Sequence, residues 1–450
     1  MHRDASLARV SAVLALAALA GCASFSPDGG GDAVAQITRE HIGQAPSIQR
    51  TDAQADAAHA RVAELLREPL SADRAVEVAL LNNRELQARY TELGIAEADL
   101  VRAGRLANPG LSFGRVSSGG TAEIDRGVLF DVLGLLTLPL ARELEQQRFG
   151  QAQLKAAEDT LALAAVARTA FFDAVTARQL VAYFEQVQQA ADVSSELARR
   201  MMAAGNFSKL AQMREQAFQS DATLQLARGR HQAVAARERL VRALALSGDQ
   251  RAFTLPDRLP DLPEAAAQPK DAEQAALDRR LDVRMARAET EATARALGLT
   301  RATRFINVLQ GGYQNKGTTG EPVLSGYVVT LELPLFDFGT ARMARAEAVY
   351  RQAVNRTAQV AIDAQSSVRE AYSAYRSAYD VARQYRDEVV PLRKRISEEN
   401  LLRYNGMLAS VFELLADSRE QIAGVTGAVE ALRDYWVAET QLQAAIGGRP

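Results

Sequence analysis

Residues 324–335 read Leu-Ser-Gly-Tyr-Val-Val-Thr-Leu-Glu-Leu-Pro-Leu, and their polarity alternates along the chain. In an extended conformation one face would carry Tyr327, Val329, Leu331 and Leu333, and the other Gly326, Val328, Thr330 and Glu332. The first face is apolar and aromatic, and about ten residues is the length that a tilted strand needs to cross a bilayer. A half-buried strand of a soluble sheet would alternate in the same way, so this stretch predicts a strand and leaves its surroundings open.

The chain contains three more β-like stretches near glycines. Phe305–Tyr313 lies before residues 324–335 in the chain. Residues 314–322 connect the two stretches, and their sequence, Gln-Asn-Lys-Gly-Thr-Thr-Gly-Glu-Pro, predicts a turn-rich loop. Leu111–Val116 and Gly127–Leu140 form a similar pair in the first half of the chain. Four strands cannot close a barrel, because the smallest membrane barrels need about eight. Strands that enter a membrane here would have to be shared among chains, and three chains would supply twelve.

The two halves of the chain repeat one plan. Ala79 and Ala276 lie in matching helical segments 197 residues apart (276 minus 79), and this offset continues into the strands. Further on, Gly205 and Gly406 match with an offset of 201 (406 minus 205). Each copy has the order helix, strand pair, long helix, glycine turn, long helix. Between the copies, the prolines of residues 255–263 predict an irregular connector, because proline cannot continue a helix.

Each copy predicts a long antiparallel helical hairpin. Residues 141–204 contain no proline and one glycine, so a helix there could extend about 95 Å at 1.5 Å per residue. After Gly205 a heptad pattern typical of a coiled-coil seam comprises Leu210, Met213, Ala217, Ser220, Leu224, Ala227, His231 and Val234. After Gly406 the pattern comprises Val411, Leu414, Ser418, Gln421, Val425, Ala428, Leu432 and Tyr435. Pro391 should kink or break the second copy's helix, where the first copy has Ala190.

Composition excludes several classes of function. The 450 residues are 48% hydrophobic and 24% charged, and the formal net charge of -2 comes without a basic stripe for a phosphate backbone. The chain has only four histidines and one cysteine, Cys22. These are too few residues to favour a zinc site or histidine-dependent catalysis. No glycine loop of the phosphate-binding kind precedes a helix. We therefore expect no enzyme, no metal site, no cofactor and no nucleic-acid partner.

The N-terminus predicts export and lipid attachment. Arg3 and Arg9 precede an apolar run, Val10–Leu19, that is too short to span a bilayer as a mature helix. Leu19-Ala20-Gly21-Cys22 resembles the bacterial lipobox, in which cleavage leaves a lipidated cysteine, so we expect a covalent lipid such as palmitate on Cys22. Ordinary signal-peptidase cleavage is the alternative. No later segment has 18 consecutive apolar residues, so we expect no transmembrane helix after the signal.

The predicted organisation has five parts. They are a signal peptide (1–21), a lipid-anchored N-terminal tether (22–72), a first repeat (73–250), a proline-rich connector (251–272) and a second repeat (273–448). The tether is expected to be extended, with a short helix at Asp52–Arg67. The fold class is mainly α with a small β part: duplicated coiled-coil hairpins plus four membrane strands per chain.

These features together resemble the TolC-type outer membrane factors, over roughly residues 73–448. The strongest local match is 333–342, Leu-Pro-Leu-Phe-Asp-Phe-Gly-Thr-Ala-Arg, which resembles the segment that leaves the family's second strand pair. Asn108–Leu111 resembles the entry to the first pair. The first copy has Leu138–Arg142 without the Phe-Asp-Phe-Gly part, so its strand-to-helix junction should be shorter. The elements that resemble the two hairpin tips are Gly205, Ser208 and Leu210, and Gly406, Ser410 and Val411.

The resemblance implies a homotrimer with a twelve-stranded β-barrel in the outer membrane and an α-barrel across the periplasm. The hairpin tips would dock on a periplasmic adaptor protein, which couples the duct to an inner-membrane pump. The chain would then be the passive outer-membrane channel of a tripartite efflux system. In some members an acidic ring narrows the periplasmic end, and the matching positions here are Phe412 and Leu415, which are not acidic. Glu413 and Asp417 lie nearby and are the aperture candidates.

Two alternatives remain. The same kind of duct could serve a type I protein secretion system, because a wide tube carries little substrate chemistry. A periplasmic coiled-coil structural lipoprotein, with the strands in a small soluble sheet, is the other alternative. Neither the transported substrate nor the class of pump follows from the sequence.

Overall fold

The computed structural model describes residues 24–448, apart from the side chains of Val411, Phe412 and Leu415. It divides into two units, each built from separate stretches of chain. The first unit comprises the described part of Met1–Val34, with Arg89–Ala156 and Leu281–Ile362. The second comprises Ala35–Ala88, Ala157–Arg280 and the described part of Asp363–Pro450. Both copies of the sequence repeat contribute to each unit.

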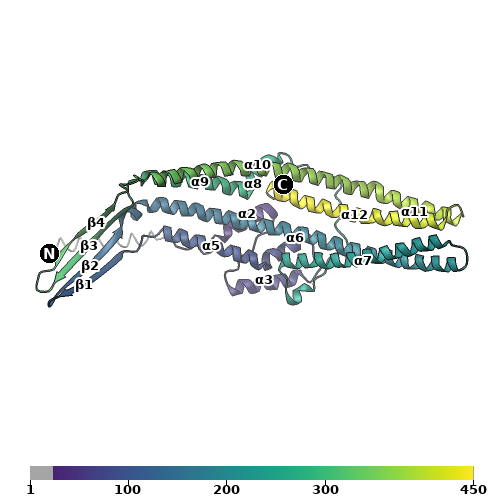
Figure 1. Ribbon diagram of the computed structural model, residues 1–450, viewed down its shortest axis with the longest axis horizontal. Helices are drawn as coiled ribbons and strands as arrows, with labels where there is room; N and C mark the ends of the chain where they lie inside the picture. The colour runs from purple at the N-terminus through teal and green to yellow at the C-terminus, as the bar shows by residue number, and fades with distance from the viewer. Residues whose placement is uncertain (1–23, 449–450) are drawn as a thin grey trace. The chain divides into compact units, whose positions relative to one another are not determined.

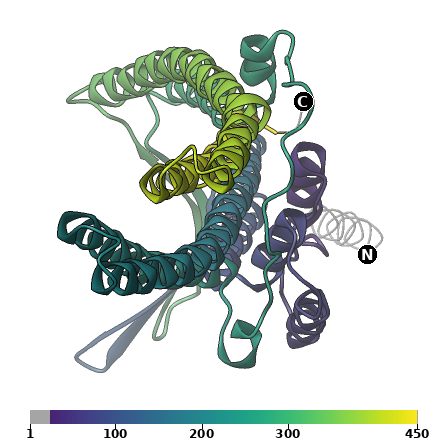
Figure 2. The ribbon, with the colours of Figure 1, turned by 90° about the vertical axis from the view of Figure 1, so that its right-hand side faces the viewer.

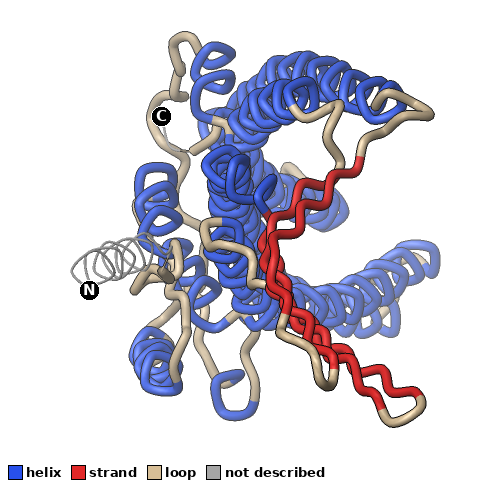
Figure 3. Tube along the Cα trace, turned by 90° about the vertical axis from the view of Figure 1, so that its left-hand side faces the viewer, coloured by secondary structure: helices blue, strands red, loops and turns tan. Residues whose placement is uncertain are grey.

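The first unit contains a four-stranded antiparallel sheet in the order β1-β2-β3-β4 (Figure 3). The strands are β1 (Gly110–Ser118), β2 (Thr121–Asp131), β3 (Val308–Thr318) and β4 (Leu324–Glu332). Helices α5 (Arg84–Ala103) and α9 (Leu281–Ala302) lead into the two strand pairs. The central pairing joins the two copies, since Val128 of β2 lies opposite Tyr313 of β3. The four predicted strands are therefore confirmed as one sheet.

The boundaries of all four strands differ from the prediction, most of all in β2 and β3. The stretch Gly127–Leu140 was expected to be one strand, but β2 ends at Asp131 and helix α6 begins at Val132. The tight turn at Gly119 and Gly120, both with positive φ, starts β2 at Thr121. At the other end of β2 the Asp131 carboxylate accepts the backbone N–H of Gly134 at 2.8 Å, which caps the start of α6. The predicted loop of residues 314–322 is also shorter, because β3 continues to Thr318.

Two long helical hairpins make up most of the second unit, although their first helices, α6 and α10, begin in stretches of chain that belong to the first unit (Figure 1). The first hairpin pairs α6 (Val132–Ala203) with α7 (Lys209–Leu244), and the 72 residues of α6 extend about 108 Å. The second pairs α10 (Thr340–Gln384), a π-helical turn (Tyr385–Val389) and α11 (Val390–Asn405) with α12 (Val411–Ile446). Figure 2 shows the two pairs from the end where the hairpins turn. Pro391, the second residue of α11, follows the π-helical turn, which confirms the predicted interruption.

Short helices and the connector pack on these hairpins. They are α3 (Asp52–Leu65), α4 (Ala72–Asn82), the 3-10 turn Gly248–Arg251 and α8 (Ala272–Arg279). The connector packs against the helices, where its Leu255, Leu259 and Leu262 are buried. Trp436 of α12 stacks on Phe172 of α6 at 5.6 Å between ring centroids. This contact joins the two hairpins of the unit.

The order of elements recurs, as the duplication predicted. The series α4, α5, β1, β2, α6, α7 is followed by α8, α9, β3, β4, α10 to α12. The tether differs from expectation: α3 matches its predicted helix, but α2 (Gly31–Ile42) was expected to be extended. Its Val34, Thr38 and His41 are buried, so positions i, i+4 and i+7 form one buried helix face, a short periodic pattern that the prediction did not use.

Candidate functional site

The sheet has one apolar and one polar face. Strand register places a set of apolar side chains together: Leu111, Phe113, Ile124, Val128, Phe130, Leu309, Tyr313, Tyr327, Val329 and Leu331. Most of these large side chains are exposed, and Tyr313 and Tyr327 meet edge to face at 6.2 Å. Arg115 and Arg126 share this face, where long side chains can extend toward a polar boundary. No element of the described chain covers this apolar face.

The opposite face is mostly polar. Its polar side chains are Ser112, Glu123, Asp125, Asp131, Gln310, Gln314, Lys316, Thr318, Thr330 and Glu332. Lys316 of β3 forms an ion pair with Glu123 of β2 across the strands. Strands of 9 to 11 residues with such two faces suit lipid on one side and water on the other.

Both edges of the sheet lack a strand partner within the described residues. β1 and β4 are the edge strands, and they run in opposite directions because the intervening pairings are all antiparallel. An exposed strand edge presents unpaired N–H and C=O groups, which favour addition of another strand. Edge β4 of one sheet can therefore pair antiparallel with edge β1 of another.

The strand-to-helix junction of the first copy is the shorter one, as predicted, but Leu138–Arg142, which was matched to it, lies inside α6. α6 starts directly after β2, whereas seven residues, 333–339, separate β4 from α10. In that longer junction Phe336 is fully exposed, and Gly339 adopts φ +69. A Cβ at Gly339 would lie 2.5 Å from the carbonyl oxygen of Arg304, so only glycine fits there. The Leu-Pro-Leu-Phe-Asp-Phe-Gly segment is thus a tight turn that exposes an aromatic side chain.

The two hairpin tips share one cap geometry, shifted by a residue from the predicted match. At the first tip Gly205 has φ +77, and its N–H donates to the Met202 carbonyl. At the second tip Gly406 has φ −81, and Met407 takes the left-handed conformation with φ +59. The Met407 N–H donates to Tyr404 in the same pattern. At the second tip Met407, and not the neighbouring Gly406, therefore supplies the positive φ.

The serines of the tips confirm this one-residue shift. Ser208 caps α7 and Ser410 caps α12, each through a hydroxyl that accepts a backbone N–H. They lie 202 residues apart (410 minus 208), as do Gly205 and Met407 (407 minus 205). Counting from the serines would have found Met407 in the sequence. Leu210 is exposed, and Val411 begins α12.

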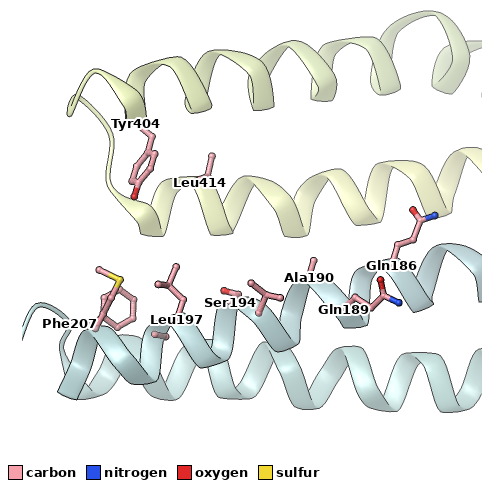
Figure 4. A pocket seen from close by; sticks show the side chains of 11 residues that line it. Gln186, Gln189, Ala190, Ser194, Leu197, Phe207, Tyr404 and Leu414 are labelled. Atoms are coloured by element: carbon pink, nitrogen blue, oxygen red, sulfur yellow. The ribbon is translucent and has the colours of Figure 1, made fainter. Parts of the chain in front are cut away.

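A groove of about 600 Å³ lies between the hairpins near their tips (Figure 4). Tyr404 and Leu414 of the second hairpin line one side, and α6 and the first tip line the other. The residues of the first hairpin that line it are Gln186, Gln189, Ala190, Val193, Ser194, Leu197, Ala198, Met201 and Phe207. The lining is mainly apolar with a few amide and hydroxyl groups, which suits an amphipathic segment.

The aperture candidates have different surroundings. Glu413 is exposed, and its carboxylate accepts a hydrogen bond from the Ser410 hydroxyl at 3.2 Å. Asp417 is only 7% exposed. Two residues further along α12, Arg419 donates to Glu215 of α7 at 3.0 Å, and Glu215 is 2% exposed. Sequence reasoning missed this ion pair, because its partners lie 204 residues apart.

The predicted coiled-coil seam of α7 is not the face that packs within the chain. All eight of its positions are exposed on the face away from α6, among them Leu210, Met213, Leu224 and Val234. The buried positions of α7 are instead Ala211, Glu215, Ala222, Leu226, Gly229, Ala236 and Leu240. α7 therefore has two apolar faces, of which only one is covered in the described chain. In α12, by contrast, Leu432 and Tyr435 of the predicted seam join the core.

The first described residues are held against α5. The Ser26 backbone N–H and hydroxyl both donate to one carboxylate oxygen of Glu97, each at 2.5 Å. Glu97 is 4% exposed, so this acid is buried and charge-assisted hydrogen bonds offset its desolvation. Cys22 lies outside the described residues.

Two features of the described residues bear on other functions. They hold no group of three His, Cys, Asp or Glu side chains placed to bind a metal ion. One described helix, α6, contains an 18-residue stretch apolar enough to cross a bilayer by length and composition. Half of that stretch is buried, as in a core helix, so it carries little weight for membrane insertion.

No protein-family model and no curated protein matches the chain. Solved structures do match. The outer membrane protein VceC from Vibrio cholerae is 15% identical, with a TM-score of 0.68 over 88% of this chain and 99% of that one. The outer-membrane channel OprN is 17% identical, with a TM-score of 0.70 over 93% and 96%. The open state of the MtrE outer membrane channel from Neisseria gonorrhoeae is 16% identical, with a TM-score of 0.70 over 84% and 89%.

Proposed function

We propose that this chain, which has the fold of the outer membrane channels, is itself a TolC-type outer-membrane exit duct of a tripartite efflux system. The observation that carries the proposal is the sheet with one apolar face, one polar face and two unpaired edges. Lipid on the apolar face and water on the polar face satisfy both sets of side chains. The chain then acts as a passive conduit, with energy supplied by a pump.

The duct is a homotrimer in this proposal. Four strands cannot close a barrel alone, whereas three sheets joined edge to edge give twelve strands without a free edge. The opposite directions of β1 and β4 support this closure, because every new pairing is antiparallel like the existing ones. The uncovered apolar face of α7 supports it too, since a neighbouring chain would bury Leu224 and its seam.

The hairpin tips dock on a periplasmic adaptor protein that connects the duct to an inner-membrane pump. Support comes from the groove beside the tips and from Met407, which is 95% exposed in a strained conformation. The docking residues proposed are Gly205, Ser208, Leu210, Gly406, Ser410 and Val411. Met407 joins them as the strained residue of the second tip. Glu413 is the better aperture candidate, because it is exposed whereas Asp417 is buried.

Lipid on Cys22 anchors the mature chain in the outer membrane. Ser26 is fixed to Glu97, and four residues of extended chain span at most about 14 Å, so the lipid cannot lie far from α5. α5 leads into β1, the first strand of the sheet. The lipid would therefore enter the bilayer on the side where the strands begin. Replacing Cys22 by Ser should abolish metabolic labelling with palmitate, and labelling that persists would contradict this part of the proposal.

Purification and conductance test the proposal as a whole. The mature protein should fractionate with outer membranes, require detergent, have the mass of a trimer and conduct ions in planar bilayers. A soluble monomer after signal removal would exclude the duct and favour the structural lipoprotein.

A further inference from the structure

The apolar face of the sheet changes its character along the strands. Strand register arranges its side chains in rows, each row joining residues at one level on neighbouring strands. The rows toward the helices are apolar, and the last of them contains Tyr313 and Tyr327. The next row toward the turns contains Arg126 and Asn315, and Arg115 lies one row further. Beyond the two tyrosines the face therefore becomes mixed and basic.

The two arginines have no acidic neighbour on this face. All four acidic residues of the strands lie on the polar face, and they are Glu123, Asp125, Asp131 and Glu332. There Lys316 forms its ion pair with Glu123. Arg115 and Arg126, in contrast, form no ion pair or hydrogen bond with any residue that the structure describes. The apolar face of each chain thus carries two positive charges that its own strands do not balance.

Arg115 and Arg126 lie close enough to contact the same anion. Arg115 is opposite Ile124, so Arg126 is its diagonal neighbour two residues along β2. Diagonal neighbours on one face of a sheet lie about 7–8 Å apart, within reach of long side chains. Both arginines are exposed, and the turns at residues 119–120 and 319–323 are too short to cover them. A guanidinium group can donate two parallel N–H bonds to phosphate oxygens.

Their position along the strands places them near one boundary of a bilayer. Rows on one face are about 6.7 Å apart, which is two residues of a strand. Arg126 lies three rows and Arg115 four rows from Leu331, or about 20 Å and 27 Å along the strands. The apolar band of an outer-membrane barrel is about 25 Å tall, and arginine is tolerated on its surface only near the boundaries. Both guanidinium groups therefore reach the level of the lipid head groups at the turn end of the strands.

We propose that Arg115 and Arg126, the arginine pair, bind a phosphomonoester group of a glycolipid in the leaflet that surrounds the turn end of the strands. A phosphomonoester has a charge close to −2 at pH 7 and balances both arginines. The single charge of a phosphodiester, as in an ordinary phospholipid, would balance only one. The amide of Asn315 and the hydroxyl of Ser117 lie on the same face and can donate further hydrogen bonds. The inference rests on the proposed function, because it takes the apolar face to lie in the outer membrane.

Binding of lipid A, a glucosamine disaccharide lipid with two phosphomonoester groups, tests the arginine pair. The full-length protein in detergent should bind labelled lipid A more tightly than phosphatidylglycerol or phosphatidylcholine. Arg115→Gln and Arg126→Gln should each weaken binding of lipid A about tenfold, because each removes charge-assisted hydrogen bonds. Lys316→Gln is the matched control, since it removes a positive charge near the same level from the polar face. It should bind lipid A like the native sequence.

The native protein alone can overturn the inference, whether or not the variants fold. Equal affinity for lipid A and phosphatidylglycerol, or for lipid A with and without its phosphates, would do so. Displacement of lipid A by an equal concentration of inorganic phosphate would show a site for free phosphate instead. Arginine variants that bind lipid A like the native protein would also contradict the arginine pair.

Glu321, the one acidic residue of the two turns, is the competing partner within an assembly. If the arginines paired with Glu321 of the partner subunit, Glu321→Gln should raise the affinity for lipid A, and the arginine variants should dissociate the trimer. Either result would overturn the lipid site. Under the inference Glu321→Gln should leave the affinity for lipid A and the mass of the trimer unchanged.

Conductance separates this inference from the proposed function. A native protein that conducts ions in planar bilayers without preferring lipid A would leave the duct standing and exclude the lipid site. A protein that prefers lipid A through the arginine pair but does not conduct would count against the duct and leave the lipid site standing.

Discussion

Of the described residues of the two tips, Met407 is the one that has a positive φ without being a glycine. A side chain in the left-handed region costs about 1–2 kcal/mol, which glycine avoids. Met407→Gly should therefore raise the unfolding free energy by about 1 kcal/mol, and Gly205→Ala at the equivalent position should lower it by about as much.

Gly406→Ala is the matched control for Met407→Gly. Gly406 has φ −81, and an added Cβ finds its nearest neighbour at 3.5 Å. Its thermal unfolding should be nearly unchanged. An unfolding temperature that is lower in Met407→Gly than in the native sequence would contradict the strain assigned to Met407.

Asp173 of α6 is the residue whose titration should couple to stability. Burial raises the pKa of Asp173 above its ordinary 3.8, although Arg433, at 3.8 Å, and Arg239 lower it. A raised folded pKa means that the contribution of Asp173 is fully present below pH 3.8 and is lost as pH rises through the folded value.

Asp173→Asn removes this loss. The unfolding temperature of Asp173→Asn minus that of the native sequence should therefore increase as pH is raised from below 3.8 toward neutrality. If the difference in unfolding temperature stayed constant across this range, the attraction of Arg433 would cancel the effect of burial on the pKa of Asp173.

At the scale of elements, the two hairpins are joined by the stack of Trp436 on Phe172. Trp436 also donates its indole N–H to the Pro260 carbonyl in the connector at 3.1 Å. Trp436→Ala should cost about 3 kcal/mol of unfolding free energy, because it removes both contacts and leaves a cavity. Trp436→Phe keeps the stacking and should cost only about 1 kcal/mol for the lost hydrogen bond. If both variants lost the same unfolding free energy in denaturant, the stabilisation would come from the hydrogen bond to the connector and not from the stacking of the rings.

At the scale of the whole molecule, the uncovered face of α7 should be the place where chains meet. Leu224 is 54% exposed at the centre of this face. Leu224→Glu should prevent trimer formation, because the charge would be buried without a partner in the assembly. Light scattering in detergent measures the mass, and Gln232→Glu, an exposed polar position on the flank of α7, is the control. A trimer that survives Leu224→Glu would move the subunit contact to another face.

Features that are local and periodic could be predicted from the order of residues. The alternation of residues 324–335, the proline-free run 141–204, the interruption at Pro391 and the duplicated order of elements all follow from spacing and backbone chemistry. The four strands and two hairpins of the fold could therefore be predicted, and with them the resemblance to a channel family.

Where a local pattern allows two arrangements, contacts between distant segments select one of them. α7 has an apolar pattern on both faces, and the spacing alone could not say that Leu226 is buried while Leu224 is not. The end of β2 depends on pairing with β1 and β3, and the Glu215–Arg419 pair joins residues of different copies. The left-handed residue at the second tip is set by the cap of α12, which places Met407 there beside a glycine. Contacts between distant segments supply the free energy for these choices, and no local pattern contains it.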